Sequence, residues 1–301
     1  MEQNEQPKAL PPYFESPARQ IWLLVALNFA CTGIFLLFTK FEALDWLVAG
    51  PEDNSPSWMG KLSNALYGII IFAVPSIVLA NALSPDRFYS FKLHRKVPIV
   101  PLILGMVALL SSVFFVDLVY TWNRTIMNDP ALLEQDKISS AYTSWILQMP
   151  DVASLVLCLF ANAFVPALVE ELFFRAGLQQ MLIRWVKKHH AAIFLSAAFF
   201  SFLHFEASGF LVRFILGVAL GYLFYWSGSL RLPILAHFAF NSFTIVNSYV
   251  MQHYAQSGWA QMETTYTLAI ISLVVSLGAL FTCRSLLLRG TAGEQGAFPL
   301  G

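Results

Sequence analysis

The stretch VEELFFR, residues 169–175, places two adjacent carboxylates and an arginine at the end of a long apolar run. A charged side chain at the centre of a bilayer costs about 2.5–3.5 kcal/mol on insertion scales, so a membrane helix that carries several is expected to use them. Glu171 and Arg175 are one helical turn apart and are expected to pair. Glu170 is rotated by about 100° from Glu171 and cannot share that partner in the same way. The spacing therefore predicts one neutralised carboxylate, Glu171, and one free carboxylate, Glu170.

The composition around this stretch is that of a membrane protein. Hydrophobic residues make up 57% of the 301 positions and charged residues only 12%, whereas a soluble domain carries about a quarter charged residues. No strand pattern competes with the helical one, so the fold class predicted is all-α and polytopic. The net charge of zero argues against a nucleic-acid partner.

Eight apolar runs are candidates to cross the bilayer, which takes about 20 residues each. The runs are 21–38, 62–83, 97–122, 152–169, 191–205, 210–226, 233–250 and 265–283. The fifth and sixth are separated only by residues 206–209, which predicts a tight hairpin. Pro75 and Pro166 fall inside spans, where a proline is expected to bend the helix.

The placement of lysine and arginine predicts the orientation. Thirteen of these residues fall in segments on the side of the N-terminus and five on the opposite side, and the excess marks the cytoplasm. Both termini are therefore expected there. We expect a cytoplasmic segment over residues 1–20, a single transmembrane domain over 21–289 with its catalytic core at about 151–250, and a flexible tail over 290–301. The polar loops 39–61 and 123–151 are expected to be solvated connectors on the outer side.

Two further groups of polar residues lie inside predicted spans. His204 ends the sequence FSFLH, and His237 and Asn241 bound the sequence HFAFN. His237 and Asn241 are four residues apart and share a helix face. A lone His204 could be a packing histidine, and the other pair could be interhelical hydrogen bonds worth about 0.6 kcal/mol each. Together with Glu170, however, these residues form a set that indicates a catalytic role more than a packing role.

A glutamate beside a histidine can bind and deprotonate a water molecule, and such general-base catalysis contributes about 10²–10⁴-fold. His237 and the Asn241 amide can donate hydrogen bonds to a developing oxyanion. No serine or cysteine is placed as a nucleophile. The residues thus support hydrolysis of an amide bond without a covalent intermediate.

Zinc is the rival use of the same side chains. Glu170, His204 and His237 would be acceptable zinc ligands, but the metalloprotease signature of two histidines four apart with an adjacent glutamate is absent. The sequence therefore favours water activation with no metal or other cofactor, and keeps zinc as the alternative.

Three motifs occur in order along the chain. They are Glu170-Glu171 with Arg175, Phe200 with His204, and His237 with Asn241. At these residues the sequence resembles the CAAX-protease and bacteriocin-processing (CPBP) family of intramembrane endopeptidases, the type II CAAX prenyl endopeptidase-like group. The resemblance covers residues 151–247, about a third of the chain.

This resemblance implies an eight-helix membrane protease that cuts a peptide or protein substrate near the cytosolic membrane face, and a lipidated substrate is one of the alternatives it leaves open. Glu170 and His204 would be the water-activating pair, and His237 with Asn241 would form the oxyanion site. The other two charged residues of the first motif would support them. The implied location is a bacterial cytoplasmic membrane.

Two other classes of protein fit the same residues. A non-catalytic membrane scaffold or bacteriocin-immunity protein could keep the motifs by descent. A proton-coupled transporter could use buried carboxylates and histidines as a relay, although no inverted repeat of the kind found in such folds is present. The sequence favours the endopeptidase over both.

Overall fold

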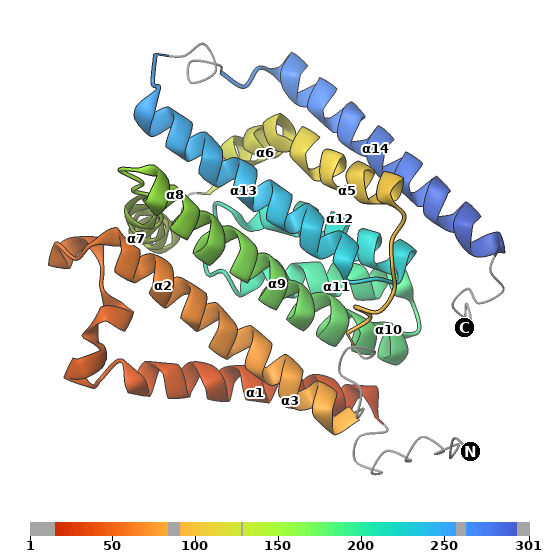
Figure 1. Cartoon of the computed structure of the whole chain (residues 1–301), viewed down its shortest axis with the longest axis horizontal. Coiled ribbons are helices and arrows are strands. Elements are labelled where there is room, and N and C mark those ends of the chain that lie inside the picture. Colours follow the sequence, from red (N-terminus) through yellow and green to blue (C-terminus); the bar gives the residue numbers. More distant parts are fainter. Residues whose placement is uncertain (1–15, 84–90, 128, 257–262, 294–301) are drawn as a thin grey trace.

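The computed structural model describes residues 16–83, 91–127, 129–256 and 263–293, and this part of the chain contains helices and no strands (Figure 1). Six stretches of helix are long and apolar enough to cross a membrane. They are α1 (Pro17–Phe38), Ser57–Leu83, Ile99–Ile126, Val152–Val186, α12 (Phe210–Ser227) and residues Tyr266–Arg289 of α14 (Tyr266–Gly293). The chain is therefore a multi-pass integral membrane protein, as its composition predicts.

Three of these stretches are divided into shorter elements. Ser57–Leu83 comprises α2 (Ser57–Gly68), η4 (Ile69–Ala73) and α3 (Val74–Leu83), and Ile99–Ile126 comprises α5 (Ile99–Ser111) and α6 (Val113–Ile126). Val152–Val186 comprises α8 (Val152–Cys158), η5 (Leu159–Phe164), α9 (Val165–Glu171), η6 (Leu172–Gln179) and α10 (Gln180–Val186). The sequence interval 152–169 predicted for this span ends too early, because the helix continues without a break to Val186.

The segments η4, η5 and η6 are π-helical turns. Pro75 and Pro166 each stand two residues after the end of such a turn, η4 and η5 respectively. A proline lacks an N–H group and its ring collides with the carbonyl four residues earlier. A π turn is one of the ways in which a helix accommodates such an interruption, and both helices continue through their prolines.

The two remaining predicted spans correspond to α11 (His189–Phe202) and α13 (Arg231–His253). α11 is apolar but has only 14 residues. α13 has 23 residues, and its polar side chains, among them His237 and Asn241, lower its mean hydropathy. The helix that carries His237 and Asn241 and the helix that ends two residues before His204 are thus the two that fall outside the set of six.

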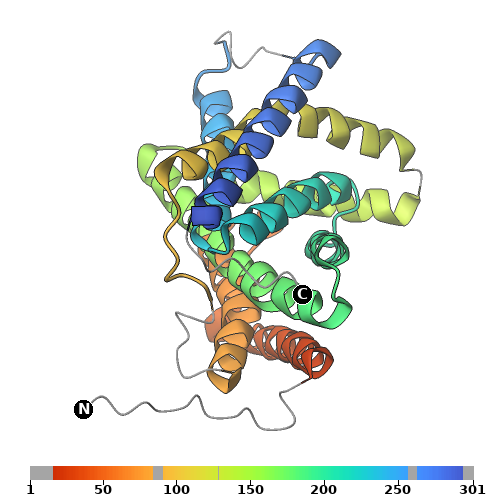
Figure 2. The same cartoon turned by 90° about the vertical axis from the view of Figure 1, so that its right-hand side faces the viewer.

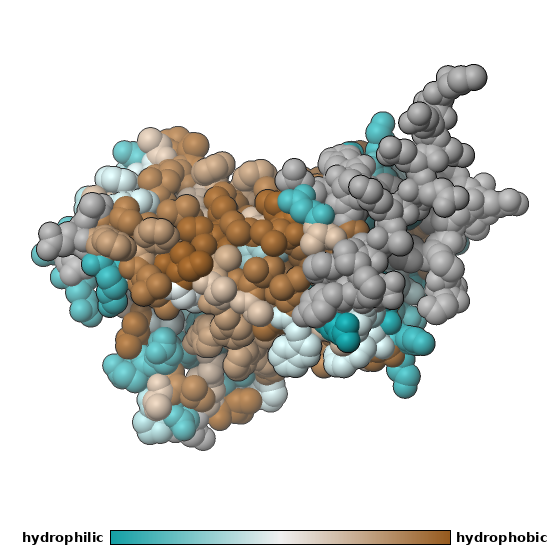
Figure 3. All heavy atoms as spheres, turned by 90° about the horizontal axis from the view of Figure 1, so that it is seen from below, coloured by the Kyte–Doolittle hydropathy of each residue, from teal (hydrophilic) through white to brown (hydrophobic). Residues whose placement is uncertain are grey.

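The helices run alternately in opposite directions along the bundle. α1 begins and α14 ends towards the right-hand end of Figure 1, and α10, α11 and the start of α13 also meet at that end. Seen from below, the surface is hydrophobic over its middle and more polar towards the left-hand edge (Figure 3). Trp22, Phe29 and Leu37 of α1 are among the large apolar side chains exposed to the surroundings, as expected where lipid is the solvent.

The apolar core has two main parts, which lie on either side of the α9–α13 contact. One joins α1, α3, α9, η6 and α11 through residues such as Leu24, Phe72 and Phe174. The other joins α5, α12, α13 and α14 through residues such as Leu109 and Leu223. Both halves of the core therefore brace the helices that carry the polar residues.

α11 and α12 pack as the predicted hairpin, joined by residues 203–209. A Cβ atom added at Gly217 of α12 would lie 3.1 Å from the Cβ of Ala197, and one added at Gly221 would lie 2.9 Å from Ile193 Cγ2. These glycines let α12 approach α11 closely, which is the role predicted for small residues four apart.

The two polar segments predicted to be loops differ from the prediction. Residues 123–151 are not a plain connector, because α7 (Pro130–Ile146) occupies most of this interval, capped by the Asp129 carboxylate. Residues 39–61 contain the short helices η2 (Glu42–Val48) and η3 (Pro51–Asp53); the Glu42, Asp45 and Asp53 side chains lie outside the described part. In the predicted tail, α14 continues to Gly293, and residues 294–301 lie outside the described part.

Candidate active site

The predicted charged pair of the first motif forms inside the protein. Glu171 is the last residue of α9, Arg175 lies in the π turn η6, and neither side chain is exposed. Arg175 Nε is 3.0 Å from Glu171 Oε2, although the N–H group is not aligned with that oxygen as a hydrogen bond requires. The contact is therefore an ion pair. The guanidinium also lies over the Phe200 ring, 5.2 Å from its centroid, in cation–π geometry.

His237 brings α13 into this pair. Its Nδ1 is 3.1 Å from Glu171 Oε1, and its Nε2 is 3.9 Å from Glu170 Oε2. An ionised carboxylate can only accept hydrogen bonds, so Nδ1 carries a hydrogen and donates it to Glu171. Glu171 is thus held by two partners, while in the described part of the chain the only ion-pair contact of Glu170 is the longer one to His237. We call Glu170, Glu171, Arg175 and His237 the ion cluster.

His204 is held by its own helix. It stands two residues beyond the end of α11, and its Nδ1 lies 2.8 Å from the carbonyl oxygen of Phe200. Because a carbonyl oxygen only accepts, Nδ1 carries the hydrogen in this contact. In the neutral ring Nε2 then keeps its lone pair, which can accept a hydrogen bond or a proton. We call residues 203–209, which follow α11 and include His204, the His204 turn.

Phe200 links the His204 turn to the ion cluster. Its ring lies edge-on to both imidazoles, with centroid separations of 4.9 Å to His204 and 6.2 Å to His237. The sequence identified this phenylalanine only as a motif position. In the structure its carbonyl orients one histidine, and its ring contacts the other histidine and Arg175.

The depths of Glu170 and His204 agree once the helix ends are known. Glu170 lies 16 residues before Val186, the end of α10, and His204 lies 15 residues after His189, the start of α11. At a rise of about 1.5 Å per residue these distances are about 24 Å and about 22 Å. The interval 152–169 predicted for this span would place the two residues at different depths. The longer helix places them at a similar distance from the α10–α11 connection.

Asn241 lies one turn after His237 on α13 and is half-buried. Among the contacts of the described residues, its side-chain amide has no hydrogen-bond partner. Its N–H groups are thus available to a bound group on the face of α13 that carries His237. The structure brings His237 together with Glu170, Glu171 and Arg175, and brings His204 to them through Phe200.

A protein-family model described as type II CAAX prenyl endopeptidase Rce1-like matches residues 152–243. This segment is Rce1-like. The match begins at the first residue of α8 and ends two residues after Asn241, so it contains the ion cluster, His204 and Asn241. It supports the CAAX-protease and bacteriocin-processing family predicted from the three motifs. No curated protein and no solved structure matches the chain.

Two residues outside the Rce1-like segment hold the His204 turn. Asp136 of α7, which is 9% exposed, accepts hydrogen bonds from the backbone N–H groups of Ala207 (3.1 Å) and Ser208 (3.0 Å). Asn123 of α6 donates from Nδ2 to the carbonyl oxygens of the same two residues, both at 2.7 Å. Figure 2 shows α6 and α7 on the flank of the bundle next to this turn.

An ion pair closes the same turn from within the Rce1-like segment. Arg213 of α12 contacts Glu206 through Nη1 to Oε2 at 2.7 Å and through Nη2 to the backbone oxygen. Phe205 has a positive φ of 51°, a backbone conformation that residues other than glycine rarely adopt. Contacts from three helices therefore fix the backbone immediately after His204. We call these contacts of Asn123, Asp136 and Arg213 the clamp on the His204 turn. No sequence motif indicated it, although Asn123 and Asp136 lie in the polar segment 123–151.

The zinc alternative can be compared with the positions of the candidate ligands. Among the described residues, no group of three or more His, Cys, Asp or Glu side chains lies so that it could hold one. Glu170, His204 and His237 are the residues of the Rce1-like segment that a zinc ion would require.

Proposed function

We propose that this protein is a CAAX-type intramembrane endopeptidase in which Glu170 activates a water molecule for attack on a peptide bond. The observation that carries the proposal is the unequal use of the two adjacent carboxylates. Glu171 is occupied by Arg175 and His237, whereas Glu170 forms no ion pair with an arginine of the described residues and approaches His237 only to 3.9 Å. A largely buried carboxylate that is not paired with an arginine is the group expected to act as a base.

In the proposed first step, Glu170 removes a proton from water while His204 Nε2 accepts the other O–H hydrogen bond. The oxygen forms a bond to the substrate carbonyl carbon, and the C=O π electrons move to the carbonyl oxygen. In the second step the C–N bond breaks, and Glu170 returns the proton to the leaving nitrogen. The products are a carboxylic acid and an amine, with no covalent enzyme intermediate.

His237 and Asn241 would stabilise the negatively charged oxygen between the two steps. Asn241 can donate from its amide. His237 already donates from Nδ1 to Glu171, so donation from Nε2 requires the imidazolium form. Its positive charge would complete the electrical balance of the ion cluster, in which two carboxylates face a single guanidinium. Loss of one oxyanion donor costs about 10²–10³-fold in rate.

We further propose that α11 and α13 complete a set of eight membrane-inserted helices, with both termini in the cytoplasm of a bacterial cell. α11 would span about 21 Å, less than the roughly 30 Å hydrocarbon core, so the His204 turn would lie within the membrane. The shared side on which α1 begins and α14 ends (Figure 1) and the excess of basic residues on that side support this orientation.

The proposal is tested with purified protein in proteoliposomes and a peptide that carries an isoprenylated cysteine followed by three residues. We expect the wild-type protein to cleave it after the modified cysteine and Glu170→Gln to lose about 10²–10⁴-fold in rate. Mass spectrometry of the products identifies the cleaved bond, and the same peptide without the lipid tests whether the lipid is required. Cleavage by Glu170→Gln at the wild-type rate would contradict the proposal.

Removal of metal with a chelator distinguishes metal-free water activation from the zinc alternative. After exhaustive treatment with a chelator, metal-free water activation predicts unchanged cleavage and less than stoichiometric zinc by elemental analysis. Loss of activity that is restored by zinc would instead support a mechanism in which a zinc ion activates the water.

Glu171 serves as a matched comparison for Glu170. Glu171→Gln should lower the thermal stability as well as the activity, whereas Glu170→Gln should leave the thermal stability nearly unchanged.

A further inference from the structure

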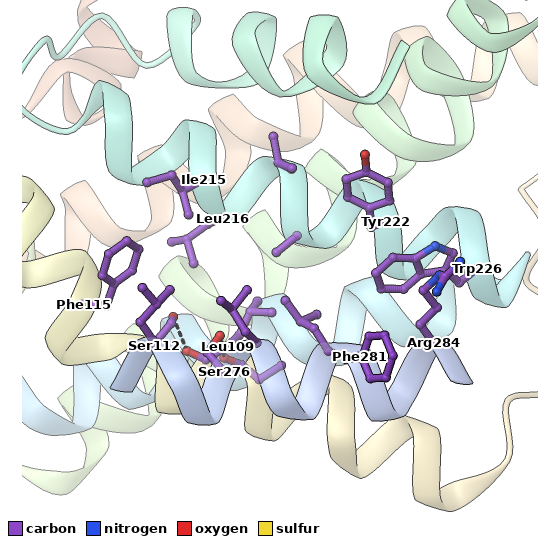
Figure 4. Close-up of a pocket in the computed structure, with 16 residues that line it drawn as sticks. Leu109, Ser112, Phe115, Ile215, Leu216, Tyr222, Trp226, Ser276, Phe281 and Arg284 are labelled. Atoms are coloured by element: carbon purple, nitrogen blue, oxygen red, sulfur yellow. Dashed lines mark hydrogen bonds between the residues drawn. The ribbon is translucent and has the colours of Figure 1, made fainter. Parts of the chain in front are cut away.

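A groove separate from the candidate active site opens between α5, α12 and α14 (Figure 4). Its volume is about 510 Å³, within the range of small-molecule sites. Apolar side chains make up most of its wall, among them Leu109, Leu216, Ala219, Leu277, Leu280 and Phe281. No residue of α9 or α13 lines it, so it is not part of the ion cluster.

Away from Trp226 and Arg284, the side-chain hydroxyl groups of the wall already have hydrogen-bond partners. Ser112 Oγ donates to the Leu109 carbonyl and Ser276 Oγ to the Ala108 carbonyl, both at 2.7 Å (Figure 4). The Tyr222 hydroxyl lies 2.6 Å from His190 Nδ1. The interior of the groove therefore offers van der Waals contact to a hydrocarbon and no hydrogen bond that selects a polar ligand.

One end of the groove is different. Arg284 and Trp226 stand there together (Figure 4), on the side of the bundle where α14 ends (Figure 1). Arg284 is exposed, and no carboxylate of the described residues forms an ion pair with it. Tryptophan and arginine at the end of a span mark the level of the lipid headgroups. This end can therefore receive an anionic group.

The length of the groove matches one leaflet of a bilayer. Its wall on α14 runs from Leu273 to Arg284, a separation of 11 residues or about 17 Å of helix. Half of a roughly 30 Å hydrocarbon core is about 15 Å. A ligand that fills the groove and places its charge at Arg284 thus has the dimensions of one lipid acyl chain with its phosphate.

We infer that this groove binds one acyl chain of an anionic phospholipid of the cytoplasmic leaflet, with the lipid phosphate at Arg284. The occupant is a resident lipid and not the substrate, since the groove shares no lining residue with the helices of the candidate active site. By filling the space between α12 and α14, the lipid would support the helix that contacts α11 through Gly217 and Gly221.

The test uses phosphatidylglycerol that carries a diazirine on its acyl chain, added to proteoliposomes of the full-length protein and activated by light. Mass spectrometry of peptides then locates the label. We expect labelling on α14 between Leu273 and Phe281. The choline analogue should label about fivefold less, the factor expected for one basic side chain near an anionic headgroup.

Two variants and their matched controls complete the test. Ala219→Phe fills the groove and should reduce labelling at least about fivefold, whereas Ile270→Phe, on the exposed face of α14, should not. Arg284→Gln should abolish the preference for phosphatidylglycerol, and Arg289→Gln should keep it. The Arg284 pair changes no buried packing, so it remains informative if Ala219→Phe does not fold.

Three results would overturn the inference. The first is equal labelling of α14 in wild-type protein and folded Ala219→Phe. The second is a preference for phosphatidylglycerol that survives in Arg284→Gln. The third is displacement of the label by an isoprenylated peptide but not by unlabelled phosphatidylglycerol, which would assign the groove to a substrate.

Discussion

The ion cluster and the His204 turn each hold one histidine of the candidate site, and they do so by different contacts. In the ion cluster, side chains of opposite charge bind one another across the α9–α13 contact, and His237 is fixed by Glu171. In the His204 turn, the histidine is held by the Phe200 carbonyl, and hydrogen bonds from α6 and α7 fix the backbone around it. The charged side chains of the ion cluster thus contact the imidazole of His237 itself, whereas those of the His204 turn contact the backbone after the histidine.

This difference predicts which part of the site contributes most to the stability of the folded protein. A buried charge that loses its partner is costly, because the remaining charge stays in a low-dielectric interior. A ring held by one carbonyl can be replaced at much lower cost. The two histidines should therefore respond differently to substitution, even though the proposed mechanism requires both.

The largest expected effect is on catalysis, and it compares the histidines directly. His204→Gln and His237→Gln should each reduce peptide cleavage about 10²–10⁴-fold. Only His237→Gln should also lower the unfolding midpoint, because it removes a partner of Glu171. The measurement pairs cleavage rates with thermal unfolding in detergent. Equal loss of stability in both variants would show that the comparison is wrong.

A second prediction concerns the charges of the ion cluster. Arg175→Leu leaves Glu171 buried with His237 as its only partner, so it should lower the free energy of unfolding by about 3–5 kcal/mol. Glu171→Leu combined with Arg175→Leu should recover part of that loss without recovering activity. Unfolding by sodium dodecyl sulfate in mixed micelles measures both variants. If the double variant were less stable than Arg175→Leu, the charges would not be compensating each other.

The clamp on the His204 turn gives a smaller effect. Asp136 accepts the N–H groups of Ala207 and Ser208 on different carboxylate oxygens. Asp136→Asn replaces one of these oxygens by an NH₂ group, which cannot accept, so one N–H group loses its acceptor at a cost of about 1–3 kcal/mol. The change in geometry next to His204 should lower kcat more than it raises KM. Glu134→Gln on the exposed face of α7 is the matched control and should change neither. A normal kcat in Asp136→Asn would separate the clamp from catalysis.

The smallest expected effect is a dependence of stability on pH, and it concerns the segment that holds the start of α13. Leu230 N–H donates to the Lys92 carbonyl at 3.4 Å, and Arg231 Nε donates to the Leu93 carbonyl at 2.8 Å. Burial, together with the nearby Arg95 and Arg184, lowers the pKa of the Lys92 ammonium from 10.5 to about 8.

Between pH 8 and 10.5 the unfolded chain therefore holds more protons at this lysine than the folded chain does. Stability should rise with pH across that window, and the penalty for charging Lys92 should be complete below it. Lys92→Met should flatten the rise, as measured by unfolding midpoints at several pH values, while Lys96→Met at an exposed position should leave it. A rise that is the same in all three proteins would exclude this lysine as its source.

The same comparison explains what the sequence could predict. The pairing of Glu171 with Arg175 and the shared face of His237 and Asn241 follow from four-residue spacing on a helix, which is local. The hydrogen bonds that fix the His204 turn join residues 71 to 85 positions apart. Asp136 and Asn123 had no spacing rule to identify them, because their role exists only once α6 and α7 pack beside the turn.

The fold could be predicted where a helix is uniformly apolar, and less well where a helix contains charged or mixed polar and apolar residues. The span from Val152 was expected to end at its first charged residues, but the helix continues to Val186 because the charges compensate one another inside the protein. α7 was missed because its 17 residues mix polar and apolar side chains in a segment that reads as a loop. The groove on α5, α12 and α14 involves distant residues and had no sequence signature.

The proposed mechanism requires that Glu170 and His204, which come from two separate helices, act on the same water molecule. A double-mutant cycle of cleavage rates tests it most directly, with Glu170→Gln, His204→Gln and both together in proteoliposomes. Residues that act as one unit lose their effect together, so the account predicts a double variant within about threefold of the less active single variant. Losses that multiply in the double variant would contradict it, since the two side chains would then act independently.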